Sequence, residues 1–398
     1  MWFVDPKKPH HVCLLHKSIY GLKRAPRAWY EKLSSALLSL KFVHSVADSS
    51  LFVHKHGSQL TVALVYVDDI MLTGSSPNFL KFVISQLQLP FPIKDLGPIN
   101  YFLGLEVNRD DSSLFLSQTR YAVDLLNKFH MDGAKPCSTP IASSTKLSKD
   151  DGVLLENLTE YRSLVGALHY LTWTRHEIAF AVNLVCQHMQ HPRTTHLAAA
   201  KRILRYIKGT LGFGGTFTKG SSFLLGFSDA DWAGNVDDKR STGGYCIFLG
   251  PNIISWSSKK QSTIARSSTK AEYRTLAHSA AEMVWICFVL QDLHFFIPVI
   301  PKLGCDNISS ISLASNHVLH LKMKHVHLDY HFIRELVQSK ALDVFYLSTI
   351  DQIADVFTKG LSASRFSLLR SKLQVDAAPF SLRGDNDAVQ VKKCSGER

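Results

Sequence analysis

The order of apolar and polar positions first predicts a hairpin near residue 68. Apolar, β-branched residues at Leu64–Val67 lead into Asp68 and Asp69, and a second apolar run, Ile70–Leu72, leaves them. This pattern predicts two strands with the acids at or beside a tight turn. Adjacent carboxylates repel each other, so the pair is costly unless a cation binds there. An acidic surface turn is the simpler interpretation, because Asp is a common turn residue.

Helical periodicity predicts five further segments before residue 210. Apolar residues recur three and four positions apart in each of them, as on the buried face of an amphipathic helix. The segments begin near Pro26, Thr119, Tyr161, Thr174 and His196. Thr174 and Glu177 have the spacing of a capping box, so the fourth helix is expected to start there.

The fifth of these helices, from His196 to Lys208, has a basic face. Lys201, Arg205 and Lys208 lie apart from its apolar positions. A solvated surface explains such charges, and so does contact with the phosphates of a nucleic-acid duplex. The residues alone leave both interpretations open.

The last third of the chain predicts an α/β domain in which three strands come first and helices then alternate with strands. Strands are expected at 223–227, 245–249, 253–256, up to 306 and at 342–347, and helices from 267 toward 290, from 309, at 325–338 and at 353–359. This βββαβαβα order resembles the RNase H fold.

Four acids fall on separate elements of this domain: Asp229, Glu272, Asp306 and Asp355. Each alone is an ordinary surface acid. Two-cation hydrolysis of a phosphodiester needs several converging carboxylates, because Mg²⁺ prefers hard oxygen ligands. Acids on four elements suit such an assembly in space. Asp231 is so close to Asp229 that the residues themselves do not choose between the two.

Composition adds a basic balance and argues against several classes of protein. The 398 residues suit two or three domains, and Lys plus Arg outnumber Asp plus Glu by 45 to 33, which suits a polyanionic partner. The seven cysteines form no Cys-x-x-Cys pair, which favours reduced cysteines in an intracellular protein over a disulfide framework. No apolar run has the length of a membrane span, so no membrane partner is expected. A cytoplasmic particle and the nucleus are the two expected locations.

Two groups of motifs closely resemble copia-type LTR retrotransposon Pol polyproteins, over about residues 3 to 380. The first group is Tyr-Val-Asp-Asp at 66–69 together with the segment 16–30, which resemble a reverse transcriptase. The second group resembles the RNase H of the same family. Its motifs are Ser-Asp-Ala-Asp-Trp-Ala-Gly at 228–234, Ser-Thr-Lys-Ala-Glu-Tyr at 268–273, Cys-Asp-Asn at 305–307 and Ile-Ala-Asp-Val-Phe-Thr-Lys at 353–359.

The resemblance implies catalytic and metal-binding residues at two sites. The polymerase ligands are Asp68 and Asp69, and the RNase H ligands are Asp229 in preference to Asp231, Glu272, Asp306 and Asp355. Each site would use two Mg²⁺ ions, with Mn²⁺ as a substitute. The nucleic-acid contacts are expected at Tyr66, Lys23, Arg24, Lys201, Arg205 and Lys208. The implied partners are an RNA–DNA hybrid, a template–primer and other Pol segments. Arg24 and His176 stand where the family usually has Gln and Pro.

The fold class that follows is mixed, α/β and α+β. We expect a partial reverse transcriptase palm and thumb start at 1–134, a linker and helical thumb or connection at 135–219, an RNase H-like α/β domain at 220–361, and a partly disordered tail at 362–398.

Copia-type polymerases also have a metal-binding Asp on a strand ahead of the segment at 16–30. Only Asp5 precedes Tyr20 here, and Asp5-Pro6 is not that motif. We therefore expect a C-terminal fragment that does not polymerise DNA alone. Three interpretations stay open: a complete RNase H behind an incomplete polymerase, part of a reverse transcriptase that another chain completes, and a non-catalytic remnant that binds nucleic acid.

A histidine-rich run at 325–331 is a weaker candidate for a metal site. His327 and His331 share a helix face, but His325 does not, and no cysteine joins them. Histidines on a basic helix that face solvent or hybrid are the favoured interpretation.

Overall fold

The computed structural model describes residues 7–8, 10–11, 22, 24–315 and 327–378. The chain forms two compact units, Met1–Gly97 with Trp285–Phe296, and Pro98–Val284 with Ile297–Arg398. The boundaries predicted at 134, 219 and 361 stay a prediction, although the first unit already ends at Gly97. No helix within the described ranges is long and apolar enough to cross a membrane.

The first unit is a four-stranded antiparallel sheet with two helices packed on one face. The sheet consists of β1 (Val43–His44), β2 (Leu51–His56), β3 (Gln59–Tyr66) and β4 (Asp69–Gly74), in chain order. The helices α1 (Ala25–Ser39) and α2 (Pro77–Gln88) share one core with the strands. That core includes Leu33 and Leu37 of α1 and Val83 and Leu87 of α2. Burial of these apolar side chains holds the helices against the sheet.

The predicted hairpin at residues 66–69 is confirmed. Along β3, the buried residues Thr61, Ala63 and Val65 alternate with more exposed ones, the period expected of a half-buried strand. Tyr66 pairs with Asp69 across a two-residue turn. The first turn residue, Val67, has a positive φ of 49°, as two-residue hairpin turns require.

The second unit contains the predicted α/β sheet, in the order β11-β10-β9-β12-β13. Its elements are β9 (Leu224–Asp231), β10 (Thr242–Leu249), β11 (Asn252–Lys260), α7 (Ser268–Asp292), β12 (Lys302–Cys305), α8 (Ile308–Ser315), α9 (His327–Gln338), β13 (Asp343–Tyr346) and the 3₁₀ helix η4 (Ile353–Phe357). The first three strands pair antiparallel, and β9, β12 and β13 are parallel. The sequence-based order of strands and helices is confirmed.

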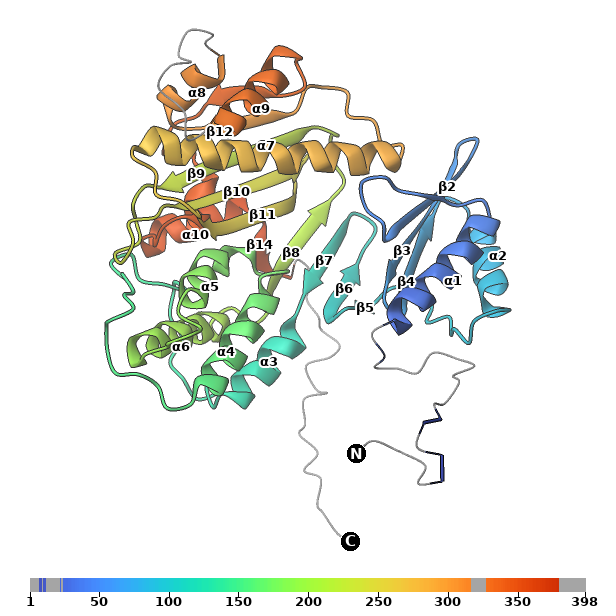
Figure 1. The fold of residues 1–398 in the computed structure, drawn as a ribbon, viewed down its shortest axis with the longest axis horizontal. Coiled ribbons are helices and arrows are strands. Elements are labelled where there is room, and N and C mark those ends of the chain that lie inside the picture. Colours follow the sequence, from blue (N-terminus) through green and yellow to red (C-terminus); the bar gives the residue numbers. More distant parts are fainter. Residues whose placement is uncertain (1–6, 9, 12–21, 23, 316–326, 379–398) are drawn as a thin grey trace. The chain divides into compact units, whose positions relative to one another are not determined.

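Helical segments cover both faces of this sheet. Helix α7 runs along one face (Figure 1), where a side chain at Gly243 would collide with Thr275 of α7. On the other face, a side chain at Gly244 would collide with Phe357 of η4. Two adjacent glycines in β10 therefore let α7 and η4 approach the sheet closely from opposite sides.

A second sheet, in the order β14-β8-β7-β6-β5, joins distant segments of the second unit. Its strands are β5 (Tyr101–Phe102), β6 (Leu105–Arg109), β7 (Ser113–Ser117), β8 (Phe213–Thr218) and β14 (Val375–Ala377). The strands β6 and β7 pair antiparallel as a hairpin. The strands β8 and β14 extend the sheet beyond that hairpin.

The helical segment between the two sheets is part of the same core. Its elements are α3 (Thr119–Lys128), α4 (Leu158–Leu171), the 3₁₀ helix η1 (His176–Ile178), α5 (Ala179–Cys186) and α6 (Thr194–Lys208). Leu164, Val182 and Ile203 from these helices pack in one cluster with Phe248 and Phe357 of the α/β part. The predicted connection therefore shares its hydrophobic core with the α/β sheet.

Residues after 361 differ from the tail that the sequence predicted. They form helix α10 (Ala363–Lys372) and strand β14, and Phe366 and Val375 are buried. Spacing within such short elements gives little signal, whereas their burial depends on the partners that they meet. The predicted disorder at 381–398 lies outside the described residues.

The capping box expected at Thr174 and Glu177 is wrong. The Thr174 hydroxyl donates to the Gln118 side chain at 2.9 Å, and α5 begins only at Ala179. The Glu177 carboxylate is buried and pairs with Arg175 at 2.7 Å. This ion pair engages the carboxylate that a capping box would have used.

Candidate functional site

Strand β9 supplies the first acid of the site. Asp229 lies opposite Gly244 of β10, and only 2% of its side chain is exposed. The hydroxyl of Thr358, just after η4, donates a hydrogen bond to Asp229 Oδ2. The contact is possible because η4 packs closely on β10 at Gly244.

Two more predicted acids, Glu272 and Asp306, lie together near the neighbouring strand β12. Glu272 is in the first turns of α7, and Asp306 follows the end of β12, which is parallel to β9. Ligand atoms of Glu272, Cys305 and Asp306 all lie within 4.8 Å of one another. Because β9 and β12 are parallel, Asp229 and Asp306 lie toward the same end of the sheet.

The fourth predicted acid, Asp355, comes from η4 and is almost completely buried. Lys359 Nζ lies 2.9 Å from Asp355 Oδ1 and 3.4 Å from Asp229 Oδ2, so one ammonium links the two acids. On its other side, Asp355 Oδ2 lies 3.4 Å from the guanidinium of Arg365 in α10.

Crowding and burial perturb the acids of the cluster. Burial raises the pKa of Asp229 to about 6, even though the Lys359 charge acts in the opposite direction. Burial also raises the pKa of Glu272 to about 9, helped by the negative charges of Asp229 and Asp306. Desolvation and like charges both disfavour ionisation, which is costly here unless a cation joins the cluster.

The donor set fits a hard divalent cation such as Mg²⁺. Glu272 Oε2 is buried and has no hydrogen-bond partner in the described part of the chain, although its neighbours are other ligand atoms. Such an orphaned oxygen is the free ligand atom that a cation needs. Burial raises the pKa of the nearby Cys305 thiol. One thiol beside two carboxylates is also not the Cys and His donor set typical of a structural zinc site.

Asp231, the alternative to Asp229, lies two residues further along the same strand. Its Oδ2 lies against Gly234, where an added Cβ atom would be 1.7 Å away. The ion pairs with Lys359 and the hydrogen bond from Thr358 go to Asp229. The contacts therefore join Asp229 to the cluster and leave Asp231 beside it.

The hairpin acids of the first unit have an open setting. Tyr66, Asp68 and Asp69 are all exposed, and the Trp29 indole donates to the Val67 carbonyl at 2.8 Å and holds the turn. In the described segments, no third acid, histidine or cysteine joins Asp68 and Asp69 in a metal-binding group.

The basic residues predicted to contact nucleic acid have different surroundings. Arg24 is exposed at the start of α1, and Lys23 lies outside the described residues. In α6, Lys201 is exposed, whereas Arg205 donates to the Lys135 carbonyl at 2.7 Å and Lys208 donates to the Asp132 carbonyl. Two of the three α6 residues predicted to contact nucleic acid thus bind the preceding segment of the chain.

Residues 327–331 of the histidine-rich run lie at the start of α9. His325 lies outside the described residues, and nothing is described of the His327 side chain. Asp329 and His331 do not belong to any metal-binding group of three or more residues within the described ranges.

No sequence pattern predicted roles for Lys359, Thr358, Arg365 or Cys305. The spacing of Asp355 and Lys359, four residues apart, was the available signal, because such residues are neighbours on a helical turn. Nothing local indicated that the same lysine reaches Asp229 on a distant strand.

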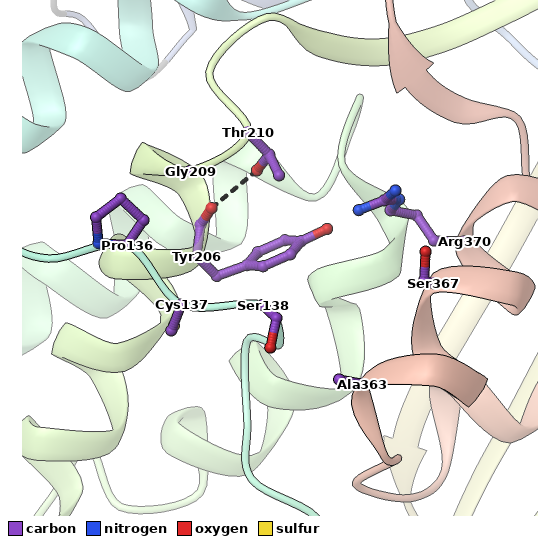
Figure 2. Close-up of a pocket in the computed structure, with 9 residues that line it drawn as sticks. All are labelled: Pro136, Cys137, Ser138, Tyr206, Gly209, Thr210, Ala363, Ser367 and Arg370. Atoms are coloured by element: carbon purple, nitrogen blue, oxygen red, sulfur yellow. Dashed lines mark hydrogen bonds between the residues drawn. The ribbon is translucent and has the colours of Figure 1, made fainter.

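A separate pocket of about 370 Å³ lies elsewhere in the second unit (Figure 2). Residues of the 136–138 segment, the end of α6 and α10 line it, and Tyr206 points across it toward Arg370. None of the four clustered acids lines this pocket.

The chain is similar to known proteins by two comparisons, a match to a family model and alignments with individual proteins. Residues 3–143 match the family model described as reverse transcriptase (RNA-dependent DNA polymerase). The chain is 48% identical over 380 residues to the retrovirus-related Pol polyprotein from transposon RE1 of Arabidopsis thaliana, an alignment that covers 95% of this chain and 26% of the relative. It is 31% identical over 285 residues to a putative transposon Ty5-1 protein of Saccharomyces cerevisiae, covering 71% of this chain and 92% of the relative.

Together with the fold, these matches define the class as reverse-transcriptase-related transposon proteins. The chain belongs to the family of copia-type retrovirus-related Pol polyproteins. It spans about a quarter of the length of the transposon RE1 relative. Among solved structures, a foamy viral protease-reverse transcriptase in complex with an RNA/DNA hybrid is 13% identical, with a TM-score of 0.43 over 83% of this chain and 39% of that chain.

Proposed function

We propose that the second unit is a ribonuclease that hydrolyses the RNA strand of RNA–DNA hybrids. The observation that carries the proposal is that acids from four separate elements form two neighbouring pairs: Asp229 and Asp355 share Lys359, and Glu272 lies beside Asp306. The negative charges of Asp229 and Asp306 both act on Glu272, which has a buried carboxylate oxygen without a partner among the described residues. Such a group of acids is unfavourable by itself and becomes favourable around divalent cations.

The four acids would hold two divalent ions, Mg²⁺ or Mn²⁺. When bound, the ions supply an activated water and charge stabilisation at the leaving oxygen of the phosphodiester. The chain itself fixes the geometry: Thr358 orients Asp229, Thr349 donates to Asp306 at 3.1 Å, and Arg365 holds Asp355. These contacts restrict the carboxylates before substrate binds, which lowers the entropic cost of assembling the site.

The substrate would be recognised by shape and charge. The chain carries a formal charge of +12, which suits the phosphates of a hybrid. Contacts to 2′-hydroxyl groups in a shallow minor groove would select the RNA strand. The phosphate contacts are expected at Lys201 and other exposed basic residues of the second unit.

The test is cleavage of a labelled RNA–DNA hybrid by the full 398-residue chain with Mg²⁺. Isolated residues 220–365 are a poor choice, because the core includes side chains of α4, α5 and α6. We expect cleavage of the RNA strand of the hybrid and no cleavage of duplex DNA. Asp306→Asn should abolish cleavage, whereas Asp343→Asn, an exposed acid 3.9 Å from Lys302, should not.

Cleavage by Asp306→Asn at the wild-type rate would refute the assignment. Hybrid binding by the wild-type chain without any cleavage would instead favour a non-catalytic protein that binds nucleic acid.

A further inference from the structure

Lys359 places a fixed positive charge inside the acid cluster. Its ammonium contacts Asp229 and Asp355 at 3.4 and 2.9 Å, and both acids are more than nine-tenths buried. Arg365 adds a second cation beside Asp355. This half of the cluster is therefore neutralised by the chain itself.

The other half of the cluster has no such cation. Glu272 and Asp306 form no ion pair with any residue that the structure describes, and Glu272 Oε2 has no hydrogen-bond partner there either. Among the described residues, the hydrogen bond that Asp306 accepts comes from a neutral group, the hydroxyl of Thr349. The cluster is thus asymmetric in charge, with protein cations on the Asp229–Asp355 side alone.

We propose that Lys359 controls how many divalent ions the site holds. The first ion binds on the Glu272–Asp306 side, where the acids have no other counter-ion. The Lys359 ammonium takes the place of a second ion beside Asp229 and Asp355 and repels one that approaches. The biological use of this control rests on the proposed ribonuclease function. The ion binding itself is measured without that function.

The lysine is also able to leave its position. Its side chain is 38% exposed and has a flexible four-carbon stem, whereas the side chains of the two acids are only 2% and 7% exposed. When nucleic acid binds, its phosphates offer the ammonium another anionic partner. The second ion would then enter only together with substrate, so the free protein does not assemble a fully loaded site.

Titration of the full chain with Mn²⁺, without nucleic acid, tests the proposal. Electron paramagnetic resonance of free Mn²⁺ gives the number of bound ions and their affinities. The wild-type chain should bind one ion tightly at this cluster and a second ion only weakly. Lys359→Met should bind a second ion at least roughly tenfold more tightly than the wild type does, because a nearby positive charge has been removed.

Three further variants make the result specific. Lys359→Gln keeps a polar side chain and should behave like Lys359→Met, which provides a second chance if one variant fails to fold. Lys359→Arg keeps the charge and should bind one ion tightly. Lys260→Met removes another lysine of the same unit, which pairs with Asp238 at 2.8 Å, and should leave Mn²⁺ binding unchanged.

Equal ion number and affinity in the wild type and in both neutral variants would overturn the proposal. The ribonuclease assay gives an independent answer. A second ion in Lys359→Met without hybrid cleavage by the wild type would support the role of Lys359 and reject the ribonuclease. Hybrid cleavage by the wild type, together with Mn²⁺ binding that is unchanged in the Lys359 variants, would support the ribonuclease and reject the role of Lys359.

Discussion

Arg175 and Glu177 form an ion pair 2.7 Å long inside the second unit, with 3% and 0% of their side chains exposed. Tyr206 donates to the same carboxylate at 3.1 Å, and Arg175 also donates to Thr210. The pair thus anchors η1 to the end of α6. Each charge is tolerated in the core because its partner and hydrogen bonds compensate for the lost water.

Loss of one partner of this pair should strongly destabilise the protein. Glu177→Gln leaves the Arg175 charge buried without its counter-ion, and we expect the free energy of unfolding to fall by about 3–5 kcal/mol. Urea denaturation followed by circular dichroism measures it. The exposed pair of Arg27 and Glu31 provides the control, since Glu31→Gln should cause no measurable change. Equal effects of the two substitutions would contradict the role assigned to burial.

Asp229 and Asp231 should differ sharply in hybrid cleavage. Asp229 contacts Lys359 and Thr358 inside the cluster, whereas Asp231 lies against Gly234. Asp229→Asn should lose cleavage by at least about a hundredfold, because even loss of an outer-shell partner of a metal site costs about 10- to 100-fold. Asp231→Asn should stay within severalfold of the wild type. If Asp231→Asn lost more cleavage than Asp229→Asn, Asp231 would be the metal ligand in place of Asp229.

The raised pKa of Glu272 should make stability depend on pH in the absence of metal. Burial raises this pKa from 4.5 to about 9, so between these values the folded chain binds one proton more than the unfolded chain. The contribution to stability is complete below pH 4.5 and is lost as pH rises toward 9, by up to about 1.4 kcal/mol per pH unit. Urea denaturation at several pH values, with a chelator present, should show this loss in the free energy of unfolding. Glu272→Gln should make the free energy of unfolding less dependent on pH.

The same proton should be released when a divalent ion binds. Metal ligands must be ionised, so apparent Mg²⁺ affinity should rise between pH 6 and pH 9 and level off above that range. Calorimetry in two buffers of different ionisation enthalpy counts the protons released at pH 7. A binding constant that stays level over the range would mean that Glu272 does not ligate the ion.

Within α6, Lys201 should contribute most to the salt dependence of nucleic-acid binding. Lys201→Ala should reduce the slope of log K against log salt by roughly 0.9, the value for one phosphate contact. Arg205→Ala and Lys208→Ala should instead lower thermal stability, because these side chains hold the carbonyls of Lys135 and Asp132. Filter binding at several salt concentrations and thermal denaturation separate the two effects. A slope unaffected by Lys201→Ala would place that side chain in bulk solvent.

Primer extension on an RNA template should fail with this chain alone. Polymerisation needs two cations held by acids from separate strands, and only Asp68 and Asp69 meet at the hairpin within the described residues. The assay uses the full chain with Mg²⁺ or Mn²⁺. Template-dependent extension that disappears in Asp68→Asn would show that another acid completes the site.

The sequence was most informative where a pattern repeats locally. The hairpin at Tyr66–Asp69 and the helices α6 and α7 follow from spacing alone, because their partners lie within a few residues or on one face. The four acids of the cluster were identified because each lies in a motif that resembles the family.

Features that depend on distant partners were missed. The spacing of Thr174 and Glu177 suggested a capping box, and only the packing of η1 against α6 reveals that Glu177 belongs to a buried ion pair with Arg175. Lys359 was unremarked for the same reason, since its contact with Asp229 crosses from η4 to β9. The residues of α10 and β14 were assigned to a tail because pairing partners such as Gly215 lie far away in the sequence.

That distant pairing also determines when the second unit is finished during protein synthesis. The strand β8 is bound by β7 on one edge and by β14 on the other, and β14 is made roughly 160 residues after β8. At typical rates of translation, this interval lasts about ten to thirty seconds. Throughout that time the nascent chain has an open strand edge, which other chains on the same messenger RNA are able to pair with. Once made, β14 covers this edge of β8 and becomes the new edge of the sheet, which is only three residues long. The last strand of the sheet therefore also shortens the edge that a neighbouring chain is able to pair with.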